Sequence, residues 1–139
     1  MQRVVFDTDL YIDWIEAGLH EELILDRSLV RYMSTVVLME LSAGALTSET
    51  AAAVMSLRRG FERVGRLLTP SADTFWRVGS TLRSLHARRR IDRRARFRLV
   101  NDCLIALSAR QIGATLLTRN ARDYQLLREI VPFSFIALP

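Results

Sequence analysis

The stretch Val4-Val5-Phe6-Asp7-Thr8-Asp9, residues 4–9, is the one around which we expect the chain to fold. Its three consecutive apolar residues, two of them β-branched, predict a short strand that is buried on both faces. The strand ends at the carboxylate of Asp7, and apolar residues return at once from Leu10. A carboxyl group between two buried segments costs on the order of 2–7 kcal/mol unless a partner satisfies it. Asp7 therefore needs a partner elsewhere in the chain.

Strand and helix patterns alternate along the rest of the sequence. Further strands are predicted at 29–34, 114–118 and 133–137, and all are short. Helices are expected at 9–16, 21–26, 35–45, 47–68, 73–90 and 99–112, and a short one from Asn120. This order predicts a helix-rich α/β fold with a short, mainly parallel sheet of about four strands, flanked by helices. No linker or repeat divides the chain, so residues 1–139 are expected to form a single domain.

Composition limits where the protein is expected to work. Half of the 139 residues are apolar, which is typical of a packed globular protein. No apolar run approaches the roughly 20 residues of a membrane span, and the N-terminus has no signal-peptide pattern. The single cysteine, Cys103, has no internal disulfide partner and favours a reducing compartment. We therefore expect a cytoplasmic protein without a membrane partner.

The basic residues are all arginines, and the chain has no lysine. This excludes chemistry that requires a lysine, such as Schiff bases and P-loop phosphate binding. It also argues against a haloacid-dehalogenase phosphatase, whose Asp-x-Asp start Asp7-Thr8-Asp9 otherwise matches. The net charge of +5 favours an anionic partner, and nucleic acid is the first candidate. We expect RNA contact at a dense arginine cluster formed by Arg88, Arg89, Arg90, Arg93, Arg94, Arg96 and Arg98.

Three acids stand in apolar runs instead of among polar neighbours: Asp7, Glu40 and Asp102. A fourth, Asp123, closely follows the strand predicted at 114–118. Asp7 and the 118–123 segment both lie just past the carboxyl ends of predicted parallel strands, where α/β sheets bind ligands. Carboxylates that meet without a cation repel one another, so a bound divalent ion is the economical explanation. Oxygen ligands suit Mg²⁺, with Mn²⁺ as a plausible substitute, and an acidic pocket on a basic protein suggests cleavage of a polyanion.

Four stretches carry a specific family resemblance: VVFDTDLYIDWI, STVVLMELSAGA, NDCLIALSARQIGATLLTRNARDY and FSFIAL. In this order they resemble a PIN-domain ribonuclease of the VapC toxin type. The resemblance implies a three-layer PIN-like fold and a Mg²⁺-dependent endoribonuclease. It also implies an acidic core of Asp7, Glu40 and Asp102, a homodimer, and a small antitoxin protein as partner.

We assign catalytic roles to Asp7, Glu40, Asp102 and Asp123, with Asp7 and Asp102 as the metal ligands. Thr8, Asp9, Thr118 and Asn120 are expected to support them. The sequence departs from the family twice: Asp9 stands where Asn or Ser is frequent, and either Asn120 or Asp123 could complete the pocket. Structural roles remain open for several of these residues. Asp7 or Asp9 could cap a helix, Asp102 could stabilise a helix start, and Asn120 with Asp123 has the spacing of a capping pair.

Two other function classes remain open from the sequence. One is a catalytically silent PIN-like module that only binds RNA or a protein partner. The other is a metal-dependent DNA nuclease. The complete acidic set argues against the first, because a binding module has no use for four converging carboxylates.

Overall fold

The sheet of this protein has five parallel strands, and a computed structural model describes it within residues 1–139. The strands are β1 (Gln2–Phe6), β2 (Leu29–Ser34), β3 (Leu67–Leu68), β4 (Thr115–Thr118) and β5 (Phe135–Ala137). Their order across the sheet is β3-β2-β1-β4-β5, so β1 lies in the centre. Val5 pairs with Tyr32 of β2 on one side and with Leu116 of β4 on the other. The predicted α/β fold with a parallel sheet is confirmed.

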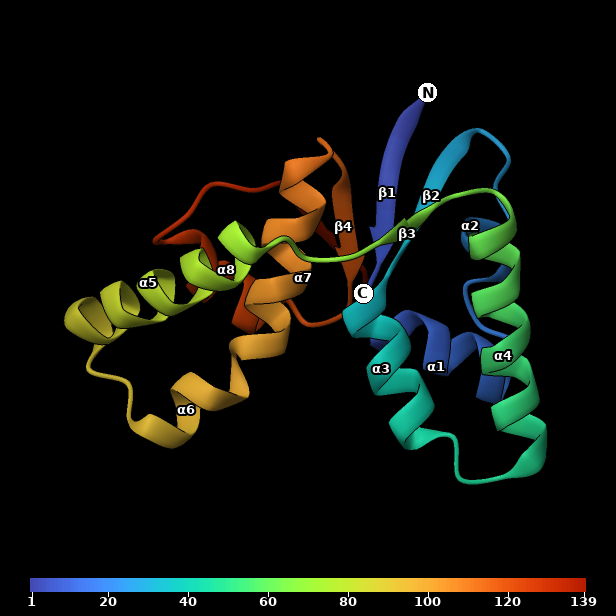
Figure 1. Cartoon of the computed structure of the whole chain (residues 1–139), viewed down its shortest axis with the longest axis horizontal. Coiled ribbons are helices and arrows are strands. Elements are labelled where there is room, and N and C mark those ends of the chain that lie inside the picture. The colour runs from blue at the N-terminus through green and yellow to red at the C-terminus, as the bar shows by residue number, and fades with distance from the viewer.

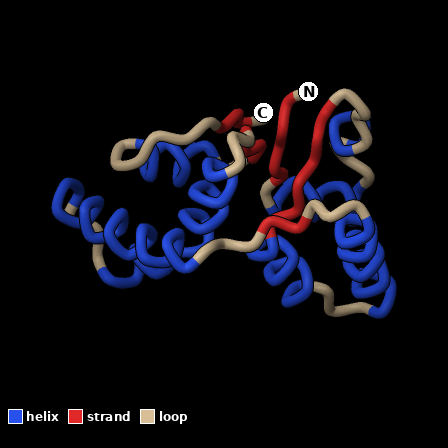
Figure 2. The backbone as a smooth tube through the Cα atoms, turned by 45° about the horizontal axis from the view of Figure 1, so that its top comes forward, coloured by secondary structure: helices blue, strands red, loops and turns tan.

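Eight helices connect and cover the strands. They are α1 (Thr8–Ala17), α2 (Glu21–Ile24), α3 (Thr35–Gly44), α4 (Ser48–Arg63), α5 (Ala72–Arg89), α6 (Arg93–Arg98), α7 (Val100–Gln111) and α8 (Ala121–Arg128). Figure 1 shows α5, α6 and α7 on one side of the sheet and α4 on the other, with α1 and α3 beyond the carboxyl end of β1. The strands therefore run between two groups of helices, as the tube in Figure 2 also shows. None of these helices is long and apolar enough to cross a membrane.

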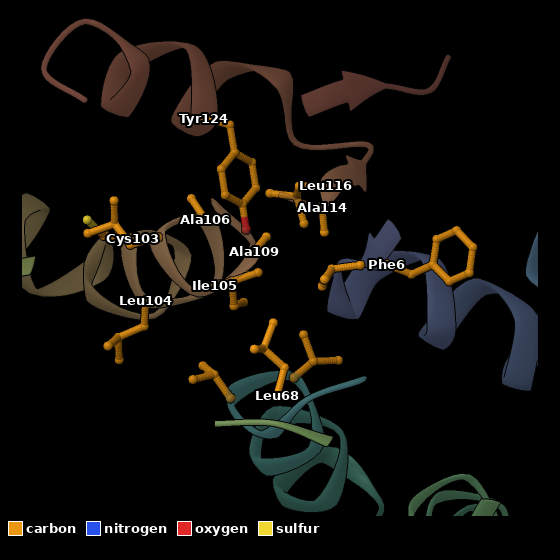
Figure 3. Packing of buried hydrophobic residues seen from close by; sticks show 14 of the residues in the cluster. Phe6, Leu68, Cys103, Leu104, Ile105, Ala106, Ala109, Ala114, Leu116 and Tyr124 are labelled. Carbon is orange, nitrogen blue, oxygen red and sulfur yellow. The ribbon is translucent and has the colours of Figure 1, made fainter. Parts of the chain in front are cut away.

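The hydrophobic core forms between the sheet and α7. Val4, Val5 and Phe6 are almost completely buried, which confirms the two-sided burial predicted for β1. From α7 the core receives an unbroken buried run, Cys103 to Ala109. Figure 3 shows the Tyr124 ring of α8 and Leu116 of β4 side by side against this helix, near Ala106. The packing fixes α7, and therefore Asp102 in its first turn, relative to the central strands.

Two segments differ from the sequence-based expectation. The helix expected at 47–68 ends at Arg63, and Gly65 takes a left-handed φ of +69° that only a residue without a Cβ adopts readily. Leu67 and Leu68 then pair with Met33 and Ser34, which adds β3 as an unpredicted edge strand. Two residues are too few to show a period, so this pairing has no local signal.

The second unpredicted element is α6, inside the arginine cluster. Asp92 accepts a hydrogen bond from the Ala95 backbone N–H at 2.8 Å and so caps the helix. No element was predicted for residues 91–98, and the cap orders part of this segment as a short helix that leads directly into α7.

Candidate functional site

Asp7 and Thr118 meet at the carboxyl ends of two neighbouring strands, β1 and β4. The Thr118 hydroxyl donates to Asp7 Oδ2 at 2.7 Å, and the Thr8 backbone N–H donates to Asp7 Oδ1 at 2.8 Å. Asp7 is thus the N-cap residue of α1 as well as a buried acid of the site. The partner that the sequence required for Asp7 is therefore a pair of neutral donors.

Glu40 reaches the same edge from α3. The Thr8 hydroxyl donates to Glu40 Oε1 at 2.7 Å, so one threonine contacts both Asp7 and Glu40. Glu40 lies in the middle of α3, whose start is fixed by the Ser34 side chain accepting from the Val36 and Val37 N–H groups. Thr8 therefore links α1 to α3 at the site through its hydrogen bond to Glu40, which agrees with a supporting role.

Asp102 lies in the first turn of α7 and is half-buried. The buried Tyr124 hydroxyl donates to its Oδ1 at 3.3 Å, and Asn120 Nδ2 donates to its Oδ2 at 3.4 Å. Its first-turn position also agrees with the helix-stabilising role left open by the sequence. Every hydrogen bond to Asp102 comes from a neutral group of α8 or its cap.

Asn120 and Asp123 form the capping pair that the spacing predicted. The Asn120 carbonyl oxygen accepts from the Asp123 backbone N–H at 3.3 Å, and Asn120 Nδ2 donates to Asp123 Oδ2 at 3.1 Å. Asp123 Oδ2 also accepts a hydrogen bond from Arg98 Nη1 at 2.7 Å. Asp123 therefore differs from Asp7 and Asp102 in having a cationic partner.

Asp9 does not cap α1, because Asp7 does. Asp9 Oδ2 instead accepts from the Arg119 backbone N–H at 3.0 Å, which ties α1 to the segment after β4. The other oxygen, Asp9 Oδ1, is buried and has no hydrogen-bond partner. A buried carboxylate oxygen without a donor costs free energy of folding. A hydrogen-bond donor or a cation at Asp9 Oδ1 would therefore stabilise the site.

Burial and mutual repulsion raise the pKa values of two acids. The pKa of Asp7 rises from 3.8 to about 6, chiefly through burial, with a further contribution from the Asp9 charge and opposition from the Thr118 hydrogen bond. The pKa of Asp102 rises to about 7, again chiefly through burial and then through the charges of Asp7, Asp123 and Glu40. The other three predicted acids therefore lie close enough to Asp102 for their charges to act on it, and the negative charge at Asp7 and Asp102 is incompletely compensated.

These residues fit a hydrated Mg²⁺ or Mn²⁺ ion better than a fully protein-enclosed metal. The donors are all oxygens, and Asp9 Oδ1 adds a buried oxygen without a partner. No group of three or more His, Cys, Asp or Glu side chains is arranged to hold an ion together. Mg²⁺ commonly uses one or two carboxylates, keeps several waters and shares substrate phosphate oxygens. Asp7 and Asp102 are the pair with uncompensated charge and would supply those carboxylates.

The arginine cluster is partly tied to other side chains. Arg88 and Arg89 both pair with Glu129, at 3.1 and 2.7 Å. Arg96 donates to the Ile91 carbonyl at 3.0 Å.

The remaining members of the cluster differ from one another. Arg93 lies over the Phe97 ring at 5.3 Å from its centroid. Arg98 reaches the acidic site through Asp123. Arg90 and Arg94 form no ion pair within the chain.

Two contributors to the site were missed from the sequence. No role was predicted for Tyr124, because hydrophobic periodicity carries no information about its hydroxyl. Arg98 looked like one of seven equivalent arginines. Both assignments depend on α8 lying beside α6 and α7, which brings residues more than 20 positions apart into contact.

A parallel sheet whose carboxyl edge gathers acids and threonines defines an α/β protein built around a carboxylate cluster. The PIN domain family model matches residues 4–128, and the chain belongs to this family. Nuclease activity is typical of PIN domains. The resemblance drawn from the sequence is thus confirmed.

Several solved structures have a similar fold. VapBC2 from Rickettsia felis, bound to a promoter DNA fragment, matches with a TM-score of 0.67 and 21% identity, covering 99% of this chain and 100% of that one. DNA-bound VapBC from Salmonella typhimurium matches at 0.65 and 23%, covering 99% and 98%. VapBC-5 from Mycobacterium tuberculosis, a toxin–antitoxin system, matches at 0.60 and 23%, covering 99% and 100%. No curated protein matches at the sequence level.

Proposed function

We propose that this protein is a Mg²⁺-dependent endoribonuclease that hydrolyses RNA phosphodiester bonds. The observation that carries the proposal is the pair Asp7 and Asp102, which lies at the carboxyl edge of the sheet with raised pKa values and only neutral hydrogen-bond donors. Such uncompensated charge is costly for folding and useful for binding a divalent cation. Membership of the PIN family supports a nuclease role for that cation.

Three acids and two threonines of the site have separate roles in this proposal. Asp7 and Asp102 hold the metal, directly or through water, and Glu40 lies beside them to accept a proton or orient a water. Thr8 and Thr118 fix the orientation of Glu40 and Asp7 through bonds of 2.7 Å. When bound, Mg²⁺ supplies water of lowered pKa for in-line attack and offsets charge on the leaving oxygen. The expected products carry a 5′-phosphate and a 3′-hydroxyl.

RNA is the proposed substrate because a basic surface adjoins the acidic pocket. Helix α6 carries Arg93, Arg94, Arg96 and Arg98 and runs directly into α7, where Asp102 lies. A positively charged surface that tracks the backbone is the usual way to bind single-stranded nucleic acid. The same surface would also bind DNA, so the experiment compares both substrates.

The test is cleavage of labelled single-stranded RNA and DNA of one sequence, with Mg²⁺ and with excess chelator. The wild type should cleave RNA only with Mg²⁺, whereas Asp7→Asn and Asp102→Asn should lose about 10²-fold or more in rate and remain folded by circular dichroism. Asp73→Asn removes an exposed acid of α5 and is the matched control. Cleavage that persists in chelator contradicts the metal mechanism. Cleavage of DNA alone would favour the DNA-nuclease alternative, and no cleavage would favour the silent binding module.

We also propose a small antitoxin partner and a homodimer. The support is that similar folds occur in VapBC complexes and that this chain has an apolar cavity of about 610 Å³ between α1, α2, β2 and α4. Tyr11 lines this cavity, and its buried hydroxyl has no hydrogen-bond partner. Exposed Phe75 and Trp76 on α5 are candidates for a contact between copies. Light scattering of the purified chain, alone and co-expressed with the product of a neighbouring short reading frame, tests both assemblies.

A further inference from the structure

Arg98 is the one member of the arginine cluster that reaches the acidic site. It is the last residue of α6, and its Nη1 atom lies 2.7 Å from Asp123 Oδ2. Arg88 and Arg89, by contrast, pair with Glu129 away from the acids. The position of Arg98 therefore joins the basic surface to the pocket that holds Asp102.

The charge of Asp123 is already paired, which separates it from the other acids. Asp123 Oδ2 accepts from both Arg98 and Asn120, whereas Asp7 and Asp102 accept only from neutral groups. A metal ion at Asp123 would have to compete with the guanidinium for this carboxylate. In the observed arrangement, Asp123 orients the guanidinium of Arg98.

The guanidinium of Arg98 keeps most of its binding capacity. An arginine has five N–H donors in a planar fork, and only one of them is used, on Asp123. The Arg98 side chain is 55% exposed, compared with 11% for Asp123. A held but accessible guanidinium of this kind suits bidentate binding of a phosphate.

We propose that Arg98 binds the RNA phosphate group at the reactive site, and that Asp123 is the positioning residue that holds Arg98 instead of a metal ligand. This inference rests on the proposed function and deepens it. It divides the four acids into a metal-binding pair, Asp7 and Asp102, a residue that accepts a proton or orients a water, Glu40, and a residue that orients the substrate-binding arginine, Asp123. The two roles for Asp123 make opposite predictions, because a metal ligand is needed for cation binding and a positioning residue is not.

The decisive variant is the double substitution Arg98→Gln with Asp123→Asn. It removes one positive and one negative charge together, so the net charge of the site stays the same. The matched control is Arg58→Gln with Glu62→Gln, which removes an exposed ion pair on α4. Titration calorimetry with Mn²⁺ measures cation binding. Fluorescence anisotropy with a labelled twelve-residue oligouridylate in chelator, over a range of salt concentrations, measures RNA binding without cleavage.

The double variant should bind Mn²⁺ within about twofold of the wild type, and the log–log salt slope of its RNA binding should fall by about 0.7, the loss of one phosphate contact. Arg98→Gln alone should lower the slope equally, while the control changes neither quantity. Arg98→Lys should keep the slope, because the charge remains, but lower kcat/KM, because the fork is lost.

An unchanged salt slope in Arg98→Gln overturns phosphate binding by Arg98. A tenfold or greater loss of Mn²⁺ affinity in the double variant makes Asp123 a metal ligand and overturns its positioning role. These failures differ from failure of the proposed function itself. In that case the wild type would bind no Mn²⁺, or would show no metal-dependent RNA cleavage.

Discussion

Tyr124 contributes a single hydroxyl group to the site, at a position from which water is excluded. The residue is completely buried, and burial raises the pKa of its phenol well above the ordinary value, so it remains a hydrogen-bond donor. Its partner is Asp102 Oδ1 at 3.3 Å. This bond favours the charged form of Asp102 and opposes the burial that raises the pKa of that acid.

Replacing Tyr124 with Phe should therefore disturb Asp102 without disturbing the core. The ring still fills the space beside α7 that Figure 3 shows, but the pKa of Asp102 should rise further and Mn²⁺ affinity should fall several-fold. Loss of this donor should cost about 1 kcal/mol in the free energy of unfolding at neutral pH. Carboxyl-carbon NMR titration and calorimetry measure these effects. Tyr32→Phe, at a half-buried tyrosine of β2, is the control. An unaltered Asp102 titration would show that the hydroxyl has no influence on the site.

Two helices at the carboxyl edge begin at polar caps that also belong to the site, Asp7 for α1 and Asn120 for α8. Asp92 caps α6 in the same way without contacting the acids. A cap fixes where a helix starts, so it fixes which residue of the first turn faces the neighbouring strand.

Within the arginine cluster, some guanidinium groups are free and others are paired with a carboxylate. Arg94 of α6 has no ion-pair partner, whereas Arg89 of α5 forms a two-oxygen contact with Glu129.

This difference predicts unequal contributions to RNA binding. Arg94→Gln should lower the log–log salt slope by about 0.7, because one free phosphate contact is lost. Arg89→Gln should change the slope much less, because the Nε and Nη2 groups of Arg89 already contact both Glu129 oxygens, whereas Arg98 uses only Nη1 on Asp123. Anisotropy titrations in chelator over a range of salt concentrations measure both. Equal losses for the two variants would mean that the pair with Glu129 opens when RNA binds.

Placing the acids close together lowers the free energy of unfolding of the whole molecule at neutral pH. The pKa values of Asp7, about 6, and Asp102, about 7, both exceed the ordinary value of 3.8. At these two carboxyl groups the folded state therefore binds more protons than the unfolded state between about pH 4 and 7. Their contribution to the free energy of unfolding then falls as pH rises through this window, and rises as pH falls. A cation that binds only the folded site should restore the stability lost at neutral pH.

Asp102→Asn should accordingly stabilise the metal-free protein at pH 7.5, by about 1 kcal/mol, and flatten the pH dependence of its melting temperature. Mg²⁺ should raise the melting temperature of the wild type, reaching about 2.7 kcal/mol of added stability at a concentration of 100 Kd. The variant should lose most of this response. Thermal melts from pH 4.5 to 8, with chelator and with a Mg²⁺ titration, measure the metal-free stability, its pH dependence and the response to Mg²⁺. If the variant is less stable without metal and responds fully to Mg²⁺, Asp102 only stabilises the start of α7.

The sequence alone determined the central strands and most of the helices, because their signals are local. Three apolar residues ending at Asp7 indicate a buried strand, and Gly18, with φ of +66°, ends α1 just past the helix predicted at 9–16. Ser34 caps α3 directly before the helix predicted at 35–45, and Asn120 with Asp123 forms the capping pair that its spacing predicted. The candidate acids could also be recognised, because a carboxylate inside an apolar run costs free energy wherever the chain places it.

The tertiary structure decided what the acids contact, because those partners come from distant parts of the chain. Strand β3 exists only because Leu67 and Leu68 meet β2, and nothing local distinguishes them from a helix end. Arg98 differs from Arg94 only because α8 lies within reach of its guanidinium. Which acid is paired with a cation and which stays uncompensated depends on packing between elements, and sequence periodicity does not encode those distances. The difference between Asp123 and the other three acids therefore became visible only in the folded molecule.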